Sequence, residues 1–76
     1  MKLRVNMLTS EEMKMITESA NLSEDQQKLL ALLHRGKMND VGMMNQMLLT
    51  ESDYYQLKKD LQLKILRALF EQYQEG

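Results

Sequence analysis

Cysteine and proline are absent from this 76-residue chain, and glycine occurs only three times. Without cysteine there is neither a disulfide nor a thiolate zinc site, which is typical of a protein kept in a reducing cytoplasm. Without proline, and with little glycine or β-branched content, helices can run uninterrupted. These absences predict an all-α fold and a cytoplasmic location.

Long apolar runs and excess charge are also missing. No stretch approaches the roughly 20 apolar residues of a membrane span, and the first five residues are too short for a signal-peptide core. The formal net charge is −1, so the chain lacks the basic excess that coats nucleic acid non-specifically, although a local basic patch stays compatible with it. We expect one small domain without membrane association.

Catalytic and cofactor motifs do not occur either. The chain has no nucleophile beside a base, no glycine-rich phosphate loop and no paired inward carboxylates. His34 is the only histidine, and a helix end, where positive charge is favoured, accounts for it. We therefore expect no enzyme, no cofactor and no metal site.

Capping signals divide the first half of the chain. Two capping boxes open helices there, namely Thr9 with Glu12 and Ser23 with Gln26. They predict a peripheral brace helix over 10–20 and a scaffold helix over 23–35, which Gly36 ends. Residues 2–5 alternate like a strand but have no partner strand, so we expect an extended or frayed arm over residues 1–8.

The second half holds a short helix and a long one. Asn39 caps the short helix, expected over 40–48, and Thr50 with Asp53 resembles a capping box that opens the long helix over 51–74. The whole is a small four-helix domain. A short helix, a tight turn and a capped helix of mixed polarity form the helix-turn-helix arrangement.

The long helix is apolar over an unusually wide arc. At about 100° per residue, one apolar stripe runs its whole length, through Tyr54, Leu57, Leu61, Ile65 and Leu69. A second stripe is confined to the C-terminal half and consists of Leu63, Leu66, Phe70 and Tyr73. In the N-terminal half the same second face carries Ser52, Tyr55, Lys59 and Gln62.

The second stripe presents more apolar surface than so small a domain can easily bury. We expect it to form a homodimer interface, because a contiguous exposed apolar patch calls for a partner. The alternative is that the brace helix over 10–20 folds back and covers it.

From about Leu22 to Ile65 the chain resembles region 4 of bacterial sigma factors, and more closely the ArpU-type transcriptional regulators of phages and prophages. The resemblance is carried by Leu22-Ser23-Glu24-Asp25-Gln26, by Leu29-Leu30-Ala31-Leu32-Leu33, and by the stretch Leu49-Thr50-Glu51-Ser52-Asp53-Tyr54-Tyr55-Gln56-Leu57-Lys58-Lys59-Asp60-Leu61. Its signature is Thr50, Tyr54-Tyr55 and Lys58. The chain departs from the pattern at two positions, because Met44 and Leu48 stand where a small residue and the turn glycine are usual.

The resemblance implies DNA binding by the long helix. Ser52, Tyr55, Gln56, Lys59 and Gln62 would face a major groove, with Gln56 suited to an adenine edge. Arg35, Lys37 and Lys58 would bind phosphate. The alternative is a solvated helix face, and the acids Glu51 and Asp53 weigh toward it.

Two hypotheses for function follow. The first is a small regulator of transcription or replication from a phage, prophage or plasmid, which binds double-stranded DNA as a homodimer over two half-sites. The second is an inhibitor or adaptor that binds protein on a sigma-like scaffold without contacting DNA. Met43 and Met47 are either core residues or a soft contact surface for a protein partner.

Overall fold

The computed structural model describes the backbone of residues 5–74 and the side chains of residues 5–71. In this part of the chain a 3-10 turn, η1 (Val5–Met7), precedes the helices α1 (Ser10–Ser19), α2 (Glu24–Arg35), α3 (Asp40–Met47) and α4 (Glu51–Gln74). No strand occurs among these residues, which confirms the all-α class. Each helix begins and ends within one residue of the bounds expected from the sequence.

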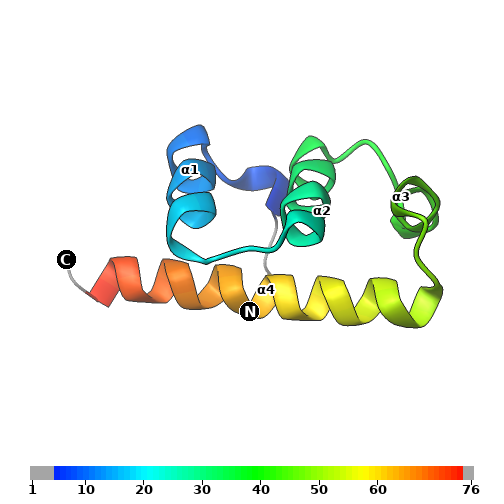
Figure 1. The fold of residues 1–76 in the computed structure, drawn as a ribbon. Coiled ribbons are helices and arrows are strands. Elements are labelled where there is room, and N and C mark those ends of the chain that lie inside the picture. The colour runs from blue at the N-terminus through cyan, green and yellow to red at the C-terminus, as the bar shows by residue number, and fades with distance from the viewer. Residues whose placement is uncertain (1–4, 75–76) are drawn as a thin grey trace.

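The three shorter helices lie in a row along one side of α4 (Figure 1). In that view α1 lies over the C-terminal half of α4, α2 over its middle, and α3 beside its N-terminal end. A helix of this length spans about 36 Å, close to the longest dimension of the molecule, 39 Å. α4 is therefore the surface on which the rest of the domain is assembled.

The predicted capping boxes form at the starts of α1 and α2, while at α4 only the Thr50 hydroxyl caps, accepting from the Asp53 N–H. The Thr9 hydroxyl accepts from the backbone N–H of Glu12 at 3.1 Å, and the Glu12 carboxylate accepts from the Thr9 N–H at 3.0 Å. Ser23 and Gln26 repeat this pattern at the start of α2. Gly36 ends α2 in the left-handed conformation, with φ +67°. These contacts satisfy backbone groups that a helix end leaves free.

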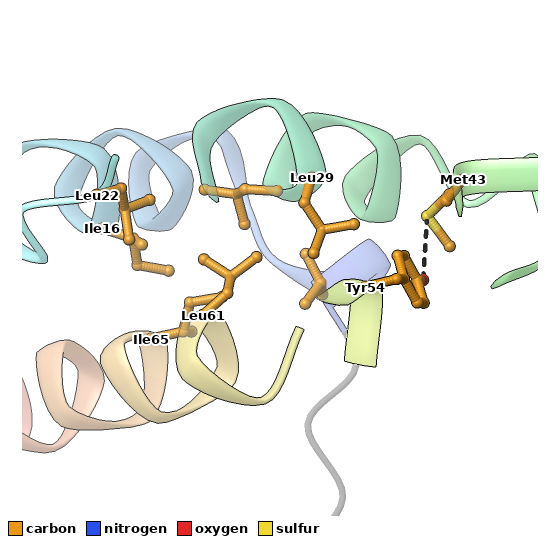
Figure 2. Packing of buried hydrophobic residues seen from close by; sticks show 9 residues of the cluster. Ile16, Leu22, Leu29, Met43, Tyr54, Leu61 and Ile65 are labelled. Atoms are coloured by element: carbon orange, nitrogen blue, oxygen red, sulfur yellow. Dashed lines mark hydrogen bonds between the residues drawn. The ribbon is translucent and has the colours of Figure 1, made fainter. Parts of the chain in front are cut away.

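The core lies between α4 and the row of short helices. Tyr54, Leu61 and Ile65 are fully buried, as the first stripe of the long helix predicts. They belong to one cluster with Ile16 of α1 and Leu29 of α2 (Figure 2). Burial of one such side chain contributes about 1.5–3 kcal/mol, so this layer supplies much of the free energy that holds the helices together.

The N-terminal arm was predicted wrongly for residues 5–8, while residues 1–4 lie outside the described part. Val5 is buried in the core cluster, and η1 packs against α2. The His34 ring donates from Nε2 to the Leu8 carbonyl at 3.0 Å. His34 thus ties the arm to α2, a long-range contact that a local sequence pattern does not reveal.

Lys64 joins the α1–α2 connection to α4. Its Nζ donates to the Asn21 carbonyl at 3.2 Å and to Gln26 Oε1 at 2.9 Å. Gln26 is the buried polar residue of the described part, and its Oε1 also accepts from the Ser23 N–H at 2.9 Å. A capping side chain therefore doubles as an acceptor for a lysine of α4.

The turn between α3 and α4 contains a strained residue. Leu48 has φ 57° and ψ 42°, which is the left-handed region, and its side chain is 91% exposed. A side chain with a Cβ in this region costs roughly 1–2 kcal/mol relative to the usual conformations. The backbone at Leu48 thus adopts a conformation that glycine favours.

Replacing Leu48 with glycine is therefore expected to raise the free energy of unfolding by about 0.5–1 kcal/mol. The strain is relieved, while little buried surface is lost. Urea denaturation followed by circular dichroism measures the change. Leu48→Ala is the matched control, because it removes the same exposed side chain and keeps the Cβ. A glycine variant no more stable than the alanine variant would contradict the assignment of strain to this residue.

Candidate nucleic-acid interface

The contact between α3 and α4 is organised by the carboxylate of Asp40. The Tyr54 hydroxyl donates to Asp40 Oδ1 at 2.7 Å, and the Lys58 ammonium donates to the same oxygen at 3.0 Å. The Tyr54 hydroxyl also lies 3.8 Å from the Met43 sulfur (Figure 2). We call Asp40, Met43, Tyr54 and Lys58 the α3–α4 corner. It fixes the direction in which α4 leaves the turn.

The contacts at the α3–α4 corner shift the pKa values of Asp40 and Tyr54 in opposite directions. The Tyr54 hydrogen bond, followed by the Lys58 hydrogen bond, lowers the pKa of Asp40 below its ordinary 3.8 against the opposing effect of burial. Burial, followed by the Asp40 carboxylate, raises the pKa of Tyr54 well above its ordinary 10.0. At neutral pH the corner therefore holds a neutral phenol and a carboxylate paired with an ammonium.

Tyr55 continues this corner toward solvent. Its ring meets that of Tyr54 edge to face, with centroids 5.2 Å apart and planes at 74°. Its hydroxyl donates to Asp40 Oδ2 at 3.5 Å, and the residue remains exposed. The ring is therefore positioned by its neighbour and still accessible to a ligand.

The side of α4 opposite the short helices is open within the described part. We call this the outer face of α4 and define it by the exposed residues Ser52, Tyr55, Lys59, Leu63, Leu66 and Phe70. Gln56 borders this face, and its amide donates from Nε2 to Asp60 Oδ1 at 3.0 Å. Gln62, expected on the same face, is half-buried at its edge. The N-terminal half of the outer face is thus polar, as the sequence predicts.

Lys58 does not belong to the outer face, contrary to the expectation that it is free to bind phosphate. Its ammonium forms an ion pair with Asp40 inside the α3–α4 corner. The reason is helical geometry, because Lys58 follows the buried Tyr54 by one turn and therefore points toward α3. Phosphate binding by Lys58 would require breaking this pair.

Arg35 and Lys37 are exposed, but the structure separates them from the outer face. Arg35 is the last residue of α2, and Lys37 follows Gly36 in the connection to α3. Figure 1 shows this connection at the edge of the row of helices farthest from α4. The expected set of DNA contacts is therefore not brought together, and these two cations are not neighbours of Lys59.

The C-terminal half of the outer face is apolar. Leu63 is 58% exposed, Leu66 38% and Phe70 62%. α1 packs against the first stripe of α4 and leaves these three side chains uncovered. The alternative that the brace helix covers the second stripe is therefore wrong for these residues. Tyr73, the fourth residue expected there, lies beyond the described side chains.

Met43 and Met47, considered as a possible surface for a protein partner, differ in burial. Met43 is buried and contacts the Tyr54 hydroxyl, so it is a core residue and offers no surface to a partner. Met47 is half-buried. It lines a shallow groove between α2 and α3, together with Leu32 and Leu48. Two methionines four residues apart on a short helix thus face different surroundings.

Comparisons with family models, with curated proteins and with solved structures found no match. Among the described residues, no helix combines the length and apolarity required to cross a membrane. No group of three or more acidic, histidine or cysteine side chains in that part of the chain could hold a metal ion.

Asp40 is the site residue that sequence reasoning missed, because its partners Tyr54 and Lys58 lie on a different helix. A signal was present, because Tyr54 and Lys58 lie one turn apart on the same side of α4. A buried phenol and a neighbouring ammonium both need an acceptor. Asp40, in the first turn of the preceding helix, was the available carboxylate.

Proposed function

We propose that this protein is a DNA-binding helix-turn-helix regulator of the phage, prophage or plasmid type, whose α4 enters a major groove. The observation that carries the proposal is the turn at Leu48, which adopts the left-handed conformation usual for the turn glycine of that motif. The α3–α4 corner then holds the two helices at a fixed angle.

The polar half of the outer face supports this assignment chemically. Gln56 offers an amide of the kind that pairs with an adenine edge, and Lys59 offers a cation for guanine or phosphate. Tyr55 stands beside them, positioned by Tyr54. The pair of Asp40 with Lys58 neutralises one carboxylate near this surface. Ser52 and Lys59 remain exposed at the N-terminal half of α4.

Binding is tested with DNA selected from a random duplex pool, followed by fluorescence anisotropy at several salt concentrations. Affinity is expected to fall steeply as salt rises, with a slope that reports the number of phosphate contacts. Failure to enrich or bind any duplex at about 50 mM salt would rule out the proposal, because the electrostatic attraction is strong under those conditions.

Lys59→Glu is expected to weaken DNA binding about tenfold or more and to reduce the salt slope by about one. Lys14→Glu is the matched control, because Lys14 is also exposed but lies on α1, over the other half of α4. It changes net charge by the same amount and should leave affinity within about twofold. Equal losses in the two variants would show that only net charge matters and that the outer face does not read DNA.

A second candidate function is protein binding without DNA contact. It is favoured by the exposed Leu63, Leu66 and Phe70, which form a contiguous apolar surface, and by the acids Glu51 and Asp53 in the first turn of α4. The groove beside Met47 adds a surface of mixed character, since charged side chains such as Lys28 and Arg35 line it beside the apolar ones. Strong salt dependence of DNA binding favours the first function, and its absence favours the second.

A further inference from the structure

The apolar half of the outer face is uncovered and flanked by charge. Lys59, Leu63, Leu66 and Phe70 fall within an arc of about 60° when residues are placed at 100° intervals. Asp60 and Arg67 lie together along one edge of this arc, about 20° apart. Both charged residues are exposed. The surface therefore has an apolar centre with an acid and a base on the same flank.

We propose that a second copy of this chain occupies this surface, with the two α4 helices antiparallel and each Asp60 opposite the partner's Arg67. The inference deepens the homodimer expected from the second stripe and rests on the proposed function only for its effect on DNA binding. In this register Leu63 faces the partner's Leu66, and Lys59 faces the partner's Phe70.

Symmetry favours the antiparallel arrangement. The two-fold axis of an antiparallel helix pair brings the same flank of both helices together. Asp60 and Arg67 share a flank and are seven residues apart, so they form two reciprocal ion pairs. The Lys59 stem can lie along the partner's Phe70 ring with its ammonium near the ring face.

A parallel pair lacks these contacts. It would place Lys59 against the partner's Lys59 at the centre of the interface, where like charges repel. It would also bring the flank that carries Asp60 and Arg67 against the opposite flank, where Gln62 and Leu69 offer no charge. Charge complementarity therefore selects the antiparallel pair.

The fold leaves room for this partner. α1, α2 and α3 all lie on the other side of α4, so the bodies of the two copies point away from each other (Figure 1). In the proposed register the last turns of the partner's α4 cross Lys59 and Tyr55. Self-association thus covers the surface assigned to DNA, and the two forms of binding compete. This dimer does not present two reading surfaces to two half-sites at once.

A charge exchange tests the register. Asp60→Arg and Arg67→Asp should each weaken dimerisation about tenfold in sedimentation equilibrium, and the double variant should restore the parent value. Circular dichroism confirms that each variant is folded. A double variant as weak as the singles contradicts the pairing, and so does a parent chain that remains monomeric up to millimolar concentration.

A distance measurement independently tests whether the two α4 helices are antiparallel. A spin label at Ser52→Cys should show a separation of about 35 Å between the two copies, since each label lies about twelve residues from the centre of the pair. A parallel pair would bring the labels within about 20 Å. The shorter distance overturns the proposal even if the charge exchange behaves as expected.

Duplex DNA separates the two proposals. Excess DNA should abolish the spin-label distance of about 35 Å, because DNA binding draws protein out of the dimer. Fluorescence anisotropy on the same samples reports DNA binding. DNA that binds without changing the distance contradicts the competition. If no variant binds DNA, the DNA function fails, and the charge exchange still decides the register.

Discussion

Leu61→Ala is expected to lower the free energy of unfolding by about 3 kcal/mol. Leu61 is 0% exposed and belongs to the cluster in which α1, α2 and α4 meet. Its truncation removes apolar contacts and leaves a cavity that the helices cannot fill without moving. A domain of this size has a total stability of roughly 4–11 kcal/mol. The variant therefore loses a large fraction of it.

The same helix offers a matched control for this prediction. Leu63→Ala removes the same atoms two residues further on, from a side chain that is 58% exposed. Its expected cost is within about 0.5 kcal/mol. Urea denaturation at low protein concentration keeps any self-association out of the comparison. Similar losses in the two variants would mean that α4 is rotated relative to the structure described above.

Tyr54→Phe is expected to cost about 1.5 kcal/mol at neutral pH. The ring stays packed, but Asp40 loses the hydrogen bond that lowers its pKa most. Tyr55→Phe is the control, because its hydroxyl makes only a long contact of 3.5 Å with Asp40 in an exposed position. It should change stability by less than about 0.5 kcal/mol. Equal effects of the two hydroxyls would contradict the role given to Tyr54.

The effect of Tyr54→Phe should depend on pH. The pKa of Asp40 is lower in the folded chain than its ordinary 3.8, so its stabilising contribution is complete above that value and is lost as pH falls below it. The stability difference between parent and Tyr54→Phe is therefore expected to be constant from about pH 5 to 7 and to shrink below about pH 4. Denaturation midpoints across this range measure it. A stability difference that grows as pH falls would contradict the conclusion that the pKa of Asp40 is lowered in the folded chain.

Most of the fold could be predicted because its signals are local. The pairs Thr9 with Glu12 and Ser23 with Gln26 set helix starts through hydrogen bonds three residues apart. The first apolar stripe of α4 follows from helical periodicity, and it faces the core, with Tyr54, Leu61 and Ile65 fully buried and the rest partly buried. Local rules of this kind depend on residues within one helical turn, so they can be read from one sequence.

The candidate site was less predictable because its parts are assembled by tertiary contacts. The position of Arg35 and Lys37 depends on which end of α2 is near α4, and no local pattern sets that direction. The burial of Met43 depends on the side of α3 that meets Tyr54. Val5 lies in a strand-like alternation that predicts no helix packing, and it is tertiary packing, including that of η1 against α2, that buries it.

α4 follows the three helices that pack against it, and this order has a consequence for folding during synthesis. α1, α2 and α3 emerge from the ribosome before the helix against which they pack. Until α4 is translated, Ile16 and Leu29 lack the main surface that buries them. The domain therefore completes its folding only after α4 has been translated, and its earlier segments depend on α4 for protection from aggregation.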